Sequence, residues 1–195
     1  MNYILRKKIR NADKKADGRN MSKRKKILFI IDFMILVLLI SLDQFTKYLA
    51  VLKLKEQSAF DIIPGILELN YLENRGAAFG MLKNQKFFFV FVAIVIIGLI
   101  IYFLYKAPDT KKFNILHLLL VMIASGAIGN MLDRIRLDYV VDFIYLVIIQ
   151  FPIFNVADMY VTVATAILVI MLLFVYKEED LNFLSFKQNK IREIK

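Results

Sequence analysis

Four long apolar runs constrain this chain more than any other feature of its sequence. They cover approximately residues 27–42, 87–105, 115–132 and 156–176. Because an α-helix rises about 1.5 Å per residue, about 20 apolar residues cross the roughly 30 Å of hydrocarbon in a membrane. The first run is short, but a helix continued to Tyr48 reaches full span. The sequence therefore predicts an all-α integral membrane protein with transmembrane helices at about 27–48, 87–105, 114–134 and 156–176.

The first apolar run also has features of a secretory signal, because a basic cluster at residues 23–26 precedes it. The following segment, Ser41–Lys47, lacks the small-residue cleavage site that such signals carry. We therefore expect this helix to be retained as an anchor. The charged arm before it, residues 1–26, shows no apolar periodicity before Met21 and is expected to be disordered. Because Met21 is itself a possible start, we hypothesise that residues 1–20 are a start-site artefact or a dispensable tail.

Basic residues predict the orientation of the four helices. The chain carries 27 Lys and Arg against 17 Asp and Glu. The basic residues are concentrated in the N-terminal arm, the 106–113 connection and the tail at 177–195. Basic segments that flank membrane helices stay in the cytoplasm. Both termini are therefore expected to be cytoplasmic, and the connections 49–86 and 135–155 to lie outside, around a membrane domain at 27–176. This distribution explains the net charge of +10 without a nucleic-acid partner.

The long outer connection, residues 49–86, is expected to contain short strands. Residues 66–74 alternate apolar and polar side chains almost at period two, after a Pro64-Gly65 turn signal. Such alternation is typical of a strand with one face against protein or membrane. The segment Gly76–Gly80 is expected to be a turn or closely packed backbone.

Polar residues recur at helical spacing near the predicted outer ends of three helices. Side chains three or four residues apart share one helix face. The three pairs are Asp43 with Lys47, Asn130 with Asp133, and Asn155 with Asp158. The predicted topology brings all three to the same membrane boundary, so we expect them to lie close together.

Each pair also has a purely structural interpretation. Asn155 and Asp158 could cap the start of a helix, where backbone N–H groups favour an acidic residue. Asp43 and Lys47 could form an ordinary ion pair along a helix. Asp133 and Arg134 could form a charge-paired helix end.

Asp142 is harder to explain structurally, because it lies in the apolar segment Val140–Ile144 with no basic neighbour. Burial raises the pKa of a carboxyl group, and two nearby carboxyl groups resist ionising together. With Asp158, Asp142 could share one proton and so supply an acid and a base for hydrolysis of a peptide bond. The chain has no cysteine and one histidine, His117, which excludes thiol chemistry and a multi-histidine zinc site within it. His117 is expected to be a packed residue. A Ser/Lys dyad would need Ser41 or Ser125 near a lysine, and Ser125 lies in the middle of a helix with no lysine close in sequence.

Five segments together resemble the lipoprotein signal peptidases, also called signal peptidase II. They occur in order between about residues 27 and 176. They are Asp43-Gln-Phe-Thr-Lys47, Glu73-Asn-Arg-Gly-Ala-Ala-Phe79, Gly126-Ala-Ile-Gly-Asn-Met-Leu-Asp-Arg134, Val140-Val-Asp-Phe143 and Phe154-Asn-Val-Ala-Asp158. The resemblance implies four helices with a small extracytoplasmic β-cradle and an active site at the outer face of the cell membrane. It also implies an endopeptidase that cuts prolipoproteins before their diacylglyceryl-modified cysteine, without a metal or organic cofactor.

The resemblance assigns roles to residues of this sequence. Asp142 and Asp158 would be the catalytic pair. Four residues would bind substrate or orient the pair, namely Asn74, Asn130, Arg134 and Asn155. Asp43, Lys47 and Asp133 would have a supporting, structural role. Lipidated prolipoproteins and membrane lipid are the expected partners, inhibitors of the globomycin type are expected to bind, and the protein is expected to be a monomer.

Two other classes of protein remain possible from the residues alone. A small transporter would need polar residues at successive depths, whereas most of those noted here gather at one boundary. A purely structural bundle would tolerate replacement of its aspartates by asparagine.

Overall fold

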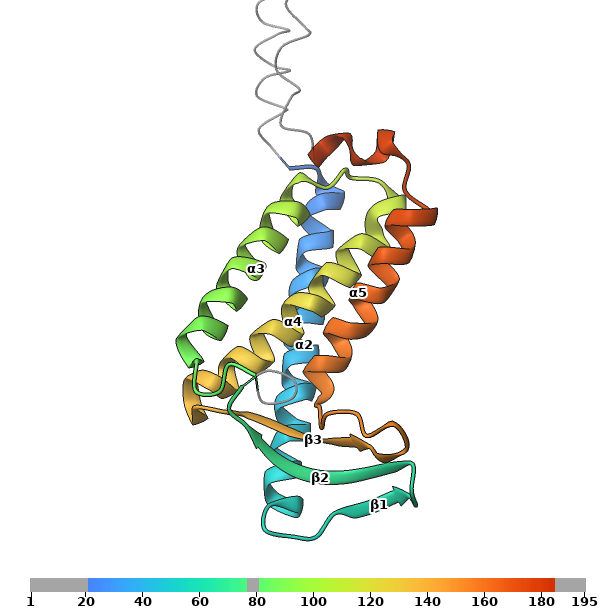
Figure 1. Ribbon diagram of the computed structural model, residues 1–195. Helices are drawn as coiled ribbons and strands as arrows, with labels where there is room; N and C mark the ends of the chain where they lie inside the picture. The colour runs from blue at the N-terminus through green and yellow to red at the C-terminus, as the bar shows by residue number, and fades with distance from the viewer. Residues whose placement is uncertain (1–20, 77–80, 185–195) are drawn as a thin grey trace, which may run out of the picture.

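A computed structural model describes residues 21–76 and 81–184 of the protein. It contains four helices that are long and apolar enough to cross a membrane, as the sequence predicts (Figure 1). They are α2 (Lys23–Leu54), α3 (Lys86–Lys106), α4 (Asn114–Leu137) and α5 (Val156–Phe174). The prediction of a disordered arm at 1–26 is wrong for residues 23–26, which form the first turn of α2. The rest of that prediction falls mostly on residues 1–20, and part of the predicted tail falls on 185–195. Both ranges lie outside the described residues.

α2 extends beyond its predicted limits of 27–48 at both ends. Ser22 caps its start, because the side-chain oxygen accepts a hydrogen bond from the backbone N–H of Lys25. Its last turn ends with Lys55 in an extended conformation. A run of apolar residues predicts the part of a helix that lies in hydrocarbon, but the helix itself can continue past that part. In α2 it does so through a basic turn at 23–26 and through residues 49–54, of which only Lys53 is polar.

α4 is the central helix of the bundle, and α3 and α5 lie on either side of it (Figure 1). Half of its most apolar stretch is buried, against 11–17% for the other three helices. Two glycines permit this packing. A Cβ atom on Gly129 would lie 2.5 Å from Oδ2 of Asp43, and one on Gly126 would collide with the backbone carbonyl of Ala157. Small residues let membrane helices approach this closely.

A three-stranded antiparallel sheet covers the end of the bundle away from residue 21 (Figure 1). Its order is β1 (Phe60–Ile63), β2 (Leu67–Asn74) and β3 (Val140–Leu146). β2 confirms the strand predicted at 66–74, and Gly65 provides the turn before it with φ +73°. β3 follows α4 directly and carries Asp142, so the sheet joins the 49–86 and 135–155 connections. Of the segment Gly76–Gly80, residues 77–80 lie outside the described part.

Candidate active site

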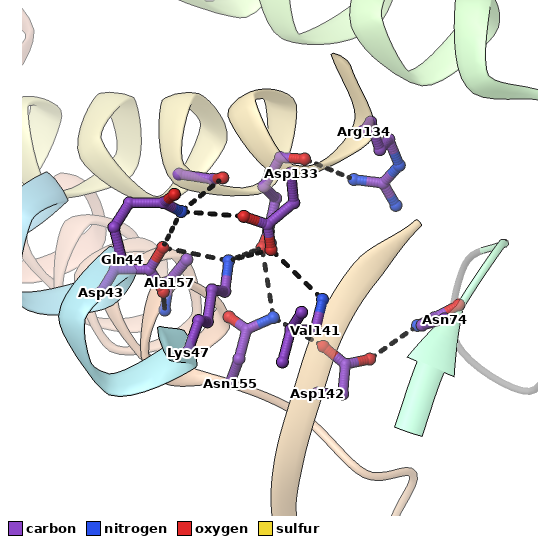
Figure 2. A network of polar contacts seen from close by, with 12 residues as sticks. Asp43, Gln44, Lys47, Asn74, Asp133, Arg134, Val141, Asp142, Asn155 and Ala157 are labelled. Atoms are coloured by element: carbon purple, nitrogen blue, oxygen red, sulfur yellow. Dashed lines mark hydrogen bonds and ion pairs between the residues drawn. The ribbon is translucent and has the colours of Figure 1, made fainter. Parts of the chain in front are cut away.

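Asp142 lies on β3 and is buried, with 1% of its surface exposed. Two amide groups hold its carboxyl group from opposite sides (Figure 2). Nδ2 of Asn155 donates a 2.6 Å hydrogen bond to Oδ1, and Nδ2 of Asn74, at the end of β2, donates a 2.8 Å bond to Oδ2. Each carboxyl oxygen therefore has a donor, and the orientation of the group is fixed.

Asp158 lies in the first turn of α5, where it completes a capping box with Asn155. The side chain of Asn155 accepts a bond from the backbone N–H of Asp158, and Oδ2 of Asp158 accepts a 3.1 Å bond from the backbone N–H of Asn155. The capping interpretation is therefore confirmed. Oδ1 of Asp158 accepts a further 2.7 Å bond from Nδ2 of Asn130 on α4. Capping does not exclude a second role, because one oxygen of Asp158 caps the helix while the other contacts Asn130.

Asp142 and Asp158 line the same cavity, which has a volume of about 350 Å³. Asn74, Asn130 and Arg134 also line it. Burial, and secondarily the negative charge of Asp158, raise the pKa of Asp142 to about 7. Near neutral pH Asp142 can thus hold a proton or release it, as an acid/base group must.

A buried ammonium group, that of Lys47, contacts residues next to this cavity without lining it. Nζ of Lys47 on α2 lies 3.0 Å from Oδ2 of Asp43 and 2.9 Å from Oδ2 of Asp133, and it donates a 2.8 Å bond to Oδ1 of Asn130. All three ionic side chains are at most 4% exposed. Lys47 therefore joins α2 to α4 and contacts directly the asparagine that binds Asp158.

The two carboxylates around Lys47 also hold backbone groups of the site (Figure 2). Asp43 accepts a 2.9 Å bond from the N–H of Ala157, and Asp133 accepts a 3.2 Å bond from the N–H of Val141. These backbone groups immediately precede Asp158 and Asp142 in the chain. The three predicted polar pairs thus meet as expected, and the Asp43–Lys47 ion pair is confirmed.

The interpretation of Asp133 and Arg134 as a paired helix end is wrong. Adjacent helix residues point in different directions, so Asp133 contacts Lys47 whereas Arg134 donates a 3.0 Å bond to the carbonyl of Gly76. The Arg134 guanidinium also lies 4.4 Å from the ring centroid of Phe89. It is therefore held at the rim of the cavity by backbone and by an aromatic face.

Two polar residues that bind other side chains within the bundle were not predicted from the sequence. Gln44 donates bonds to Asp133 at 2.9 Å and to Asp43 at 3.2 Å. Its place beside Asp43 in an apolar run was the available signal. Asp32 pairs with His117 at 2.7 Å in the interior between α2 and α4, so His117 is packed as predicted, but against a carboxylate.

The remaining alternative chemistry gains no support from the geometry. Ser125 is buried and donates its hydroxyl to the carbonyl of Val121 within its own helix. Within residues 21–76 and 81–184, no three His, Asp or Glu side chains are grouped so as to hold a metal ion. The expectation of metal-free chemistry stays a prediction.

Comparison with known proteins identifies the family. Residues 35–174 match the model of the family described as signal peptidase (SPase) II. The chain belongs to the signal peptidase II family. The lipoprotein signal peptidase of Streptococcus pyogenes serotype M5 (strain Manfredo) is 46% identical over 156 residues, which are 80% of this chain and 97% of the relative. That of serotype M3 (strain MGAS315) is 45% identical over the same lengths.

Solved structures agree with this family assignment. A bacterial membrane enzyme solved by the in meso method at 1.9 Å matches with a TM-score of 0.66 and 33% identity, over 75% of this chain and 94% of its own. A second, at 2.3 Å, matches with a TM-score of 0.65 and 32% identity, over 73% and 87%. As a signal peptidase II, the protein is a multi-pass membrane aspartic peptidase of lipoprotein processing.

Proposed function

We propose that this protein is the endopeptidase that removes signal peptides from prolipoproteins, cutting before the diacylglyceryl-modified cysteine, and that Asp142 and Asp158 are its catalytic pair. The observation that carries the proposal is that both carboxyl groups line one cavity while separate asparagines orient them. Burial raises the pKa of Asp142 to about 7, as expected of a group that donates a proton near neutral pH.

In the proposed reaction Asp158 is the base and Asp142 is the acid. The carboxylate of Asp158 takes a proton from water, whose oxygen attacks the carbonyl carbon of the scissile bond. Protonated Asp142 donates its proton to the carbonyl oxygen, which gives a neutral tetrahedral diol. As the diol collapses and the C–N bond breaks, protonated Asp158 gives its proton to the leaving amine, and the Asp142 carboxylate takes the proton of one diol hydroxyl. The pair thus returns to its starting state with one proton.

The surrounding residues position this pair and the substrate. Asn74 and Asn155 fix the carboxyl group of Asp142, and Asn130 fixes that of Asp158. Arg134 lines the cavity, and within the described residues its guanidinium donates to the carbonyls of Gly76 and Asn130, which uses two of its five N–H groups and leaves others for a substrate carbonyl. Asp43, Lys47 and Asp133 hold the backbone and Asn130 in place and do not line the cavity.

The basic segments support an active site at the extracytoplasmic face. Lys23–Lys26, Lys106, Lys111 and Lys112 are all at the helix ends remote from the sheet (Figure 1). Because such segments stay in the cytoplasm, Asp142 and Asp158 would lie at the outer boundary. A lipidated precursor, with its signal segment in the bilayer, presents its scissile bond at that depth.

Mass spectrometry of the products tests the reaction. Purified protein in lipid should cut a synthetic prolipoprotein that carries the diacylglyceryl group, and the product mass should place the cut directly before the modified cysteine. A globomycin-type inhibitor should stop this cleavage. The same peptide without lipid is the control and should be cut much more slowly. Cleavage at another bond, or equal cleavage of both peptides, would refute the proposed function.

A further inference from the structure

Two cavities lie between α3 and α5, one beside the candidate active site and one toward the opposite end of the bundle. Near the site, a cavity of about 270 Å³ lies between these helices and contains Asp158. Near the other end, a second cavity of about 210 Å³ lies between the same helices. α4 forms the floor of both cavities.

The two cavities lie on the same side of α4 and of α5. On each of these helices, most of the lining residues recur at steps of three or four positions or at multiples of such steps, which keeps them on one side. On α4 they include Leu116, Leu120, Ile123, Ala127 and Asn130, and on α5 Asp158, Val161, Leu168 and Leu172. We call this stripe and the facing residues of α3 the α3/α5 groove. It is almost wholly apolar beyond its active-site end.

The 3-10 helix η4 (Glu178–Leu184) closes the far end of this groove. The chain turns after α5 and runs back across the end of the bundle toward α3 (Figure 1). Leu181, Phe183 and Leu184 line the 210 Å³ cavity together with Phe103 of α3 and Leu172 of α5. An apolar segment lying in the groove would therefore meet η4.

η4 is fixed in this position by several contacts. The ring of Phe113, at the start of α4, stacks on Tyr176 at 5.4 Å and meets the ring of Phe183 edge-on at 5.6 Å. Asp180 pairs with Lys112 and accepts a 2.8 Å bond from the backbone N–H of Lys177. These contacts favour one fixed position of η4 over a mobile segment.

The length of the groove matches the apolar part of a signal peptide. From Asp158 to Leu172, α5 rises about 21 Å, at 1.5 Å per residue. A helical substrate segment of about 14 residues has this length, and the apolar regions of signal peptides contain about 7–15 residues.

We propose that the α3/α5 groove holds the apolar signal segment of the precursor and that η4 is the stop that limits its length. The inference rests on the proposed function, because the groove begins at the candidate catalytic pair. Phe183 and Leu184 are thus specificity-determining residues far from the reacting bond. A segment longer than the groove would displace either η4 or the scissile bond, and a misplaced bond reacts slowly.

Three lipidated substrates that differ only in apolar length test this proposal. With segments of about 10, 14 and 20 residues, the protein should cleave the first two at similar kcat/KM and the longest roughly tenfold or more slowly. The variant Phe183→Ala with Leu184→Ala should cleave the longest substrate nearly as well as the middle one. Leu184→Trp, which fills the cavity, should slow the middle substrate but not the shortest. Phe174→Ala is the control, since Phe174 is 80% exposed at the end of α5 and should leave the length profile unchanged.

The ratio of rates between substrates is independent of how much enzyme is folded. Equal cleavage of all three lengths by the unaltered protein would refute the proposal that η4 limits segment length. A length limit that neither the alanine variant nor the tryptophan variant shifts would refute it as well. If none of the substrates is cleaved, the proposed function itself fails, so the two failures are distinguishable.

Discussion

Replacing Lys47 by methionine should destabilise the protein more than any other single loss of charge near the site. The ammonium group is buried and contacts two carboxylates, those of Asp43 and Asp133, at 3.0 and 2.9 Å. Methionine has a similar length but leaves both carboxylates without their cation. Breaking a buried ion pair costs about 3–5 kcal/mol, because the remaining charge stays desolvated. The ratio of folded to unfolded protein should therefore fall by about two to three and a half orders of magnitude.

Denaturant titration in lipid–detergent micelles measures this loss, with helix content as the signal. Lys53→Met is the matched control, because Lys53 lies on the same helix but is exposed, and it should change stability by less than about 1 kcal/mol. Adding Asp43→Asn and Asp133→Asn to Lys47→Met removes the stranded charges and should recover part of the stability. A loss below about 1 kcal/mol in Lys47→Met, or no recovery in the triple variant, would refute the reasoning.

Three further predictions concern protonation, packing and a second buried pair. Because the pKa of Asp142 is raised to about 7, its proton is lost as pH rises through 7. Above that pH, kcat/KM should fall by about tenfold per pH unit. A flat profile of kcat/KM from pH 6 to 9 would contradict the role of Asp142 as the acid. Gly129→Ala places a Cβ 2.5 Å from a buried carboxylate oxygen and should cost about 1–3 kcal/mol in the same titration, whereas Gly98→Ala, with no atom within 4 Å, should be neutral or slightly stabilising. His117→Leu leaves the buried carboxylate of Asp32 without its partner and should lower the free energy of unfolding by about 3 kcal/mol or more. The folded variant should keep kcat within about twofold, since the Asp32–His117 pair does not line the cavity. A large loss of kcat would point to a role in the reaction.

The sequence predicts the helices because their signal is local. A run of about 20 apolar residues needs no tertiary partner to be identified. The same holds for β2, whose alternation and preceding Gly65 turn lie within the ten residues 65–74, and for the cap formed by Asn155 and Asp158. Helix ends are predicted less accurately, since α2 begins in the basic turn at 23–26 and continues through the mostly apolar residues 49–54.

Contacts between distant residues could not be predicted in the same way. Asp32 and His117 are 85 positions apart, and nothing in either segment identifies the other. Asp133 and Arg134 are neighbours with opposite charge, but helix geometry directs Asp133 toward Lys47 on another helix. The part of the site that was predicted, the meeting of three polar pairs, followed from topology together with helical spacing.

The catalytic pair is the central claim, and the most direct measurement compares Asp142→Asn, Asp158→Asn and the double variant in cleavage of the lipidated substrate. Asn preserves shape but cannot exchange a proton, so each single variant should remain folded and lose at least about 10³-fold in kcat. The double variant should be scarcely slower than either single variant, because the pair acts as a unit. Asp61→Asn, on the exposed strand β1, is the control and should keep full activity. Retained cleavage in either single variant, or losses that multiply in the double variant, would contradict the account.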